Sequence, residues 1–147
     1  MIINLTRKYL HFFNFLLWLN MSNSFASNCT IENDVIQGDC PKSKSTLIVK
    51  SSITEVGVIG GAIIYNAGNL DLRGISNGDI TVYEGGNLSV SGHVNATVIN
   101  DGGTVDIKGH VKFLQGNSGN SSVEGFADHA TGRINLKKGS IVNGIMN

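Results

Sequence analysis

Two histidines and two tyrosines occupy matching places in similar segments, which makes them the first candidates for chemistry. His93 and His110 each follow a glycine, and Tyr65 and Tyr83 take equivalent positions, with Asn100 at the third such position. Two imidazoles can hold a metal, but no third ligand is placed by the sequence. Stacked, exposed aromatic rings suit contact with a protein or a carbohydrate. No metal site is therefore predicted, and Tyr65 and Tyr83 are candidate partner-binding residues.

Catalytic motifs are not found in the sequence. It has no nucleophile elbow, no zinc-binding HExxH, no P-loop and no dinucleotide fingerprint, and no acidic pair stands out for acid–base chemistry. The 11 basic residues balance the 11 acidic ones, which argues against a partner held through nucleic-acid phosphates. We predict a protein that is not an enzyme, with no catalytic residues, no cofactor and no nucleic-acid partner.

The two cysteines, Cys29 and Cys40, are predicted to form a structural disulfide. They lie close together in the sequence, and such pairs join in an oxidising compartment. Closing a short loop contributes about 2–3 kcal/mol, mostly by restricting the unfolded chain. A metal-binding or redox-active pair would favour CxxC spacing, which is absent. We expect residues 27–44 to form a disulfide-closed cap at the N-terminal edge of the fold.

The first 26 residues have the features of a secretory signal peptide. Arg7 and Lys8 precede an apolar run over 10–19, and the small residues Ser24 and Ala26 stand at the −3 and −1 positions of a cleavage site. The apolar run is shorter than the ~20 residues that span a bilayer. We expect export to the periplasm, cell surface or medium, with no transmembrane segment in the mature chain. The alternative is an uncleaved membrane anchor.

A short repeat is the strongest structural signal in the sequence. Three segments align with one another: 64–74, 82–92 and 99–109. Their leading glycines, Gly68, Gly86 and Gly103, recur every 17 to 18 residues, and each is followed by an apolar-x-apolar run. A weaker copy lies at 132–136 and a degenerate one at 46–49. Alternation of period two between Gly, Asn and Asp is typical of strands and turns.

This period predicts an all-β, single-domain parallel β-solenoid, in which each copy supplies one coil. About five coils fit into residues 45–147, with glycines at corners that need a positive φ. The side chains expected to point inward are Leu70, Leu72, Leu88, Val90, Val105 and Ile107. The alternative is an antiparallel β-sandwich, which explains the alternation but not the recurring copy.

Two further segments could carry contacts. Residues 116–131 are rich in Gly, Asn and Ser, which predicts an irregular loop extruded from the solenoid. The chain ends in an apolar run without a polar cap, so Ile145 and Met146 are candidate partner-binding residues, and a homo-oligomer is one expected outcome.

The Gly-Gly-x-Leu-x-Val-x-Gly spacing within 82–108 resembles two groups of bacterial repeat proteins, the passenger repeats of autotransporter adhesins and the bactofilins. The resemblance implies the solenoid fold and does not assign a function, because bactofilins lack a cleaved signal. We expect a small exported non-catalytic protein that acts in binding or structure at the cell envelope or surface. Its partner would be a protein, a cell-surface glycan or its own copy. The alternative is a periplasmic inhibitor or immunity-type protein that blocks a toxin or hydrolase through the 116–131 loop.

Overall fold

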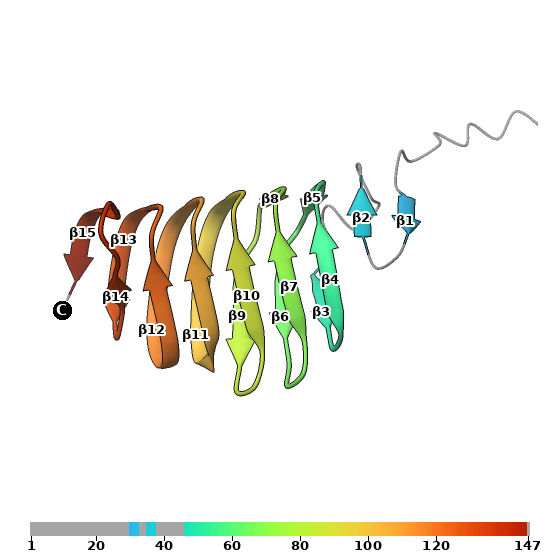
Figure 1. Cartoon of the computed structure of the whole chain (residues 1–147), viewed down its shortest axis with the longest axis horizontal. Helices are drawn as coiled ribbons and strands as arrows, with labels where there is room; N and C mark the ends of the chain where they lie inside the picture. Colours follow the sequence, from blue (N-terminus) through green and yellow to red (C-terminus); the bar gives the residue numbers. More distant parts are fainter. Residues whose placement is uncertain (1–29, 33–34, 38–45, 147) are drawn as a thin grey trace, which may run out of the picture.

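The computed structural model describes residues 30–32, 35–37 and 46–146, which form a parallel β-solenoid without a helix (Figure 1). The predicted fold class is confirmed, with about six turns instead of about five. Figure 1 shows the strands side by side in one row that runs from β4 to β15. In the described part, no helix is long and apolar enough to cross a membrane.

Each turn contributes a strand to three faces, here named A, B and C in chain order. Face A contains β4 (Ser52–Glu55), β7 (Asn69–Leu72), β10 (Asn87–Val90), the ends of β11 (His93–Ile107) and β12 (His110–Val123), and β14 (Asn135–Leu136). Face B contains β5 (Val58–Ile59), β8 (Ile75–Ser76) and the starts of β11, β12, β13 (Phe126–Gly132) and β15 (Ile141–Met146). Face C contains β3 (Leu47–Val49), β6 (Ala62–Ile64), β9 (Ile80–Tyr83), and later parts of β11, β12, β13 and β15.

An antiparallel hairpin precedes the first turn. It consists of β1 (Thr30–Glu32) and β2 (Val35–Gln37), and β2 pairs in parallel with β4 on face A. Cys29 and Cys40 lie outside the described residues, so the disulfide-closed cap remains a prediction.

The core consists of ladders of Leu, Val, Ile and Ala that stack turn upon turn. Leu70, Leu88 and Val105 pair in register, and so do Leu72, Val90 and Ile107. All six are at most 2% exposed, which confirms the predicted inward set. Because the apolar residues have the same spacing within each copy, each one stacks on the equivalent residue of the preceding turn, and these stacks form the core.

The repeat register confirms the weaker copy, whose Asn135 and Leu136 continue the face A ladder, and corrects one expected copy and the expected loop. The degenerate segment 46–49 lies on face C, and the copy that precedes 69–72 is β4. Residues 116–131 are not an irregular loop, because β12 continues to Val123 and β13 begins at Phe126. The repeat was hidden in both places because a polar residue, Glu55 or Ser121, takes an inward position that is apolar in the other copies.

The corner between faces A and B is a column of glycines. At this corner the carbonyl of Gly92 accepts a hydrogen bond of 3.0 Å from the amide of His110 in the next turn. A Cβ on Gly109 would lie 2.1 Å from that same carbonyl oxygen. A Cβ on Gly74, Gly92 or Gly125 would likewise lie 2.0 to 2.2 Å from a glycine carbonyl oxygen of the preceding turn. Close approach of neighbouring turns explains these glycines, whereas the expected positive φ occurs at other corners, as in Gly85 and Gly102.

Candidate functional site

The two candidate histidines meet on the outer side of face B. His93 pairs with His110, and their ring centroids lie 4.8 Å apart in an edge-to-face contact, as do those of His110 and Phe126. The Nε2 atom of His110 lies 3.5 Å from Oδ1 of Asp128. Among the residues whose side chains are described, no group of three or more His, Cys, Asp or Glu gathers in a way that could hold a metal.

The two candidate tyrosines form an exposed stacked pair beside face C. The rings of Tyr65 and Tyr83 lie 5.5 Å apart at 22°, with Nζ of Lys50 at 5.8 Å from the Tyr65 ring. Asn100 is not the third rung of this stack, since Tyr83 pairs with Asp101 and Asn100 points inward. The partner-binding role of the pair stays a prediction.

The C-terminal candidates lie on the last strand of face C. Backbone pairing places Ile145 beside Ala130 and Met146 beside Thr131 in the parallel ladder of β13 and β15. Their side chains lie outside the described part, so only their register is known.

A buried polar cluster that was not predicted joins β11 to β12. Asn100 is fully buried and donates from Nδ2 to Oγ of Ser121 at 2.9 Å and to the carbonyl of Asn120 at 3.1 Å. Its Oδ1 accepts a hydrogen bond of 2.9 Å from the amide of Gly103. The sequence alignment placed Asn100 with Tyr65 and Tyr83, and only the strand pairing shows that it follows the buried Ile64 and Val82. The cluster fixes the position of the strand segment at Asn120 and Ser121.

A polar hollow of about 670 Å³ opens beside this cluster, between β12 and β14. Its polar lining residues are Thr104, Asn120, Ser121, Ser122, Arg133 and Asn135. Asn120, Ser121 and Ser122 belong to the segment 116–131 that was expected to carry contacts, whereas Thr104, Arg133 and Asn135 were not predicted as site residues. The hollow exists because the last turn has fewer residues than the preceding turn at the corner between faces C and A. This difference becomes visible only when the register of the strands is known.

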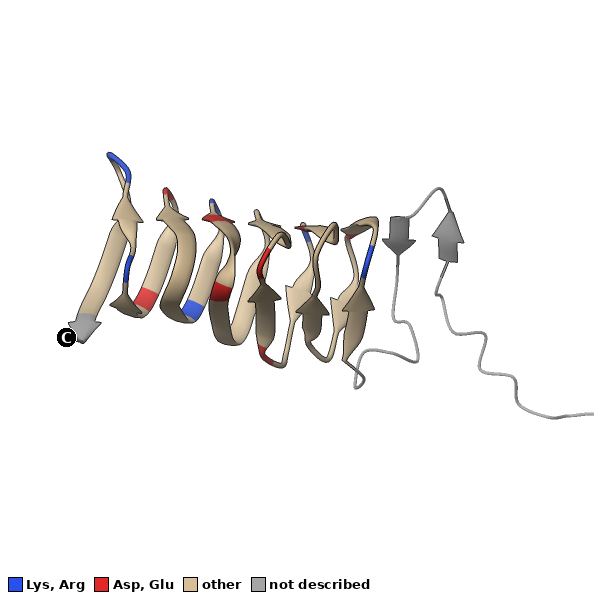
Figure 2. Cartoon of the chain, turned by 90° about the horizontal axis from the view of Figure 1, so that it is seen from below, with Lys and Arg blue, Asp and Glu red and all other residues tan. Residues whose placement is uncertain are grey.

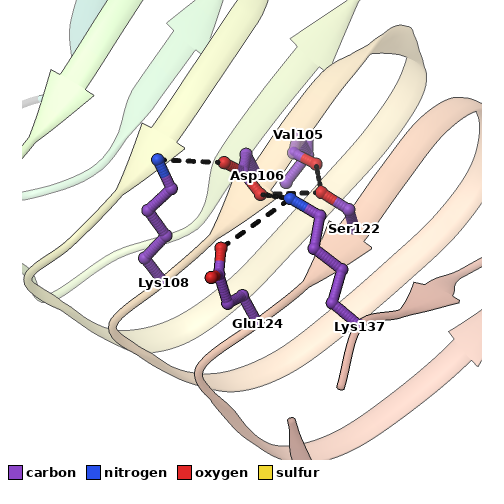
Figure 3. A network of polar contacts seen from close by, with 6 residues as sticks. All are labelled: Val105, Asp106, Lys108, Ser122, Glu124 and Lys137. Atoms are coloured by element: carbon purple, nitrogen blue, oxygen red, sulfur yellow. Dashed lines mark hydrogen bonds and ion pairs between the residues drawn. The ribbon is translucent and has the colours of Figure 1, made fainter. Parts of the chain in front are cut away.

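An ion-pair network lies on the outer side of face A (Figure 3). One of its members, Ser122, also lines the hollow. The Asp106 carboxylate accepts a hydrogen bond of 2.7 Å from Ser122 Oγ and lies 3.3 Å from Nζ of Lys137 and 3.4 Å from Nζ of Lys108. Partial burial favours the neutral form, but the Ser122 hydrogen bond and the Lys137 ammonium outweigh it. The pKa of Asp106 therefore lies below its usual range, and both lysines are occupied by this carboxylate.

Glu55 is a second unpredicted feature, a fully buried carboxyl at the first turn of face A. It occupies the ladder position held by Leu72, Val90 and Ile107 in later turns. Its Oε1 accepts a hydrogen bond of 2.6 Å from the amide of Gly57, while Oε2 has no hydrogen-bond partner among the described residues. Burial raises the pKa of Glu55, and the Gly57 hydrogen bond opposes this only in part.

Replacing Glu55 by glutamine is expected to stabilise the protein at neutral pH. Because the folded-state pKa is raised, the wild type loses stability as pH rises from about 4 through that pKa, whereas Glu55→Gln stays uncharged. An ionised buried carboxyl with an unpartnered oxygen costs roughly 1–3 kcal/mol. We expect a gain in the free energy of unfolding of this size at pH 7.5 that vanishes below about pH 4.

Urea unfolding at a series of pH values measures this difference. Glu84→Gln, at an exposed position, is the matched control and is expected to change nothing. A variant Glu55→Gln that is less stable than the wild type at pH 7.5 would show that the Glu55 carboxylate has a stabilising partner.

Charged residues of both signs are interspersed along the solenoid (Figure 2). No protein family, curated protein or solved structure matches the chain.

Proposed function

We propose that the protein is an exported, non-catalytic β-solenoid that associates end to end with its own copies, in a structural or binding role at the cell envelope or surface. The observation that carries this proposal is that, within the described residues, the edge strands of face C at both ends of the solenoid are paired on one side only.

Strand β15 is six residues long and pairs with β13 on one side, and no other strand of the described part pairs with it. At the opposite end of the same face, β3 pairs only with β6 within the described residues. An unpaired edge strand is a template for another chain.

A second copy is the occupant that best fits these two edges. All strands of face C run in parallel, so β3 of a second copy placed beside β15 would continue the same ladder. Such a head-to-tail contact is heterologous and, unless the rotation closes a ring, it extends into a filament.

Export is supported by the signal-peptide features of residues 1–26, which include Arg7, Lys8 and the small residues before the cleavage site. The repeat spacing within 82–108 resembles that of autotransporter passengers and bactofilins, which fits an adhesive or structural role. The inhibitor alternative is less favoured, since the segment 116–131 on which it depended belongs to strands of the solenoid.

Light scattering after size exclusion tests the proposal on the mature chain, 27–147, under non-reducing conditions. We expect a mass that increases with protein concentration. A charge at the last rung is expected to prevent strand addition, because it would have to be desolvated between two chains. Ile145→Glu and Met146→Glu should therefore each elute with the mass of one chain.

Ile75→Glu is the matched control, because Ile75 is an exposed isoleucine (40%) on face B in the middle of the solenoid. It should assemble like the wild type, and circular dichroism should show the same β-rich spectrum for all variants. A wild type that stays at the mass of one chain at every concentration would overturn the proposal.

A further inference from the structure

The hollow between β12 and β14 arises because the last turn cuts across the corner between faces C and A. Gly132 pairs with Gly116, and Asn135 pairs with Ser122. Between these paired positions β12 contains residues 117–121, whereas the sixth turn contains only Arg133 and Ile134. The wider corner of the fifth turn therefore lacks a strand beside it. The resulting volume, about 670 Å³, lies within the ~300–1,000 Å³ that ligand sites enclose.

The uncharged polar lining offers both donors and acceptors of hydrogen bonds. Thr104 provides a hydroxyl group, and Asn120 and Asn135 provide side-chain amides. Ser122 provides an acceptor oxygen, because its hydroxyl hydrogen is donated to Asp106. Val105 and Ile134 add apolar surface between them. Alternating hydroxyl, amide and apolar contacts match a sugar ring, whose hydroxyls need donors and acceptors and whose C–H groups need an apolar neighbour.

Arg133 is the charged lining residue of the hollow. It forms no ion pair with the side chains described in the structure, in contrast to Arg73, which pairs with Asp71 at 2.8 Å. The nearby carboxylate of Asp106 is neutralised by two lysines. The guanidinium thus remains available for an anion, and its planar fork fits a carboxylate in a bidentate manner.

One wall of the hollow is fixed from inside the solenoid. The Nδ2 group of Asn100 holds both the carbonyl of Asn120 and the hydroxyl of Ser121. A wall held by buried hydrogen bonds needs no ordering when a ligand enters, which favours binding.

From this combination we infer that the hollow binds a saccharide unit that carries a carboxylate, such as a uronic acid. The carboxylate lies against Arg133, and the ring hydroxyls lie against Thr104, Asn120, Ser122 and Asn135. This site is separate from the open strand edge of face C that the self-association requires.

Titration of the Ile145→Glu chain, which is expected to keep the mass of one chain, with glucuronate tests the inference when amide chemical shifts are followed in NMR spectra. Glucose and acetate are the control ligands, since glucose has the ring hydroxyls without a carboxylate and acetate has a carboxylate without the ring. We expect glucuronate to shift the amides of residues 119–122 and 133–135, and to bind at least tenfold more tightly than glucose or acetate.

Two arginine variants complete the experiment. Arg133→Gln should weaken glucuronate binding at least tenfold, while Arg73→Gln, an exposed arginine beside face A and outside the hollow, should leave it unchanged. Absence of shifts at these amides, equal binding of glucose or acetate, or unchanged affinity in Arg133→Gln would each overturn the inference. Light scattering on the wild-type chain reports self-association separately, so the two proposals fail independently.

Discussion

Replacing Gly109 by alanine is expected to destabilise the protein by roughly 3–5 kcal/mol, in the range reserved for severe single substitutions. The new Cβ would lie 2.1 Å from the carbonyl oxygen of Gly92 and 2.6 Å from that of Ser91. Both are backbone atoms of the preceding turn, and the Gly92 carbonyl already accepts the amide of His110. The clash can be relieved only by separating two turns, which breaks the parallel ladder on both sides of the corner.

Gly139→Ala is the matched control, because it separates close approach from backbone conformation. Gly139 has a φ of +96°, and a Cβ there would meet nothing within 4 Å. We expect a loss of about 1–2 kcal/mol from the strained left-handed backbone alone. Thermal unfolding of both variants measures which one loses more stability. If Gly109→Ala were no worse than Gly139→Ala, the close packing of turns at this corner would be wrong.

The β-solenoid could be predicted from the sequence because each repeat packs only against the repeats next to it in the chain. Each copy repeats the same apolar-x-apolar run at nearly constant spacing, so the positions of Leu70, Leu88 and Val105 above one another follow from the period. The same reasoning placed His93 beside His110 and Tyr65 beside Tyr83, and both pairs are in contact in the structure.

Prediction failed where a buried position carries a polar residue. Glu55 and Ser121 broke the apolar pattern, so one copy of the repeat was assigned to 46–49 and another was taken for a loop at 116–131. Asn100 was expected outside because the repeat alignment placed it with Tyr65 and Tyr83, whereas in the structure it pairs with the inward Val82 and its hydrogen bonds are satisfied inside.

The candidate site could not be predicted because it depends on the register between turns. The hollow exists because Gly132 pairs with Gly116 and Asn135 pairs with Ser122. This pairing leaves the last turn with too few residues to cover the corner. In the sequence, residues 133–134 belong to the weaker repeat copy at 132–136, and nothing in that copy shows that the corner before it is short. Arg133 therefore carried no signal until the missing strand segment beside it was known.

Replacing Asn100 by alanine is expected to lower the free energy of unfolding by about 2–4 kcal/mol, since it leaves several buried groups without partners. The amide of Gly103 would lose its acceptor, and the carbonyl of Asn120 and the hydroxyl of Ser121 would lose their donor. Because these last two groups form the wall of the hollow, Asn100→Ala should also weaken glucuronate binding while the protein is folded. Urea unfolding and the NMR titration measure the two effects on one sample.

Asn117→Ala is the control that separates a buried hydrogen bond from an exposed one. Asn117 donates to Oδ1 of Asp101 at 2.6 Å and accepts from Nε2 of Gln115 at 2.8 Å, but it lies on the surface. Water replaces both bonds when the side chain is removed, so we expect a change within about 0.5 kcal/mol. Equal losses in the two variants would mean that Asn100 is hydrated, and that the wall beside Arg133 is not held from within.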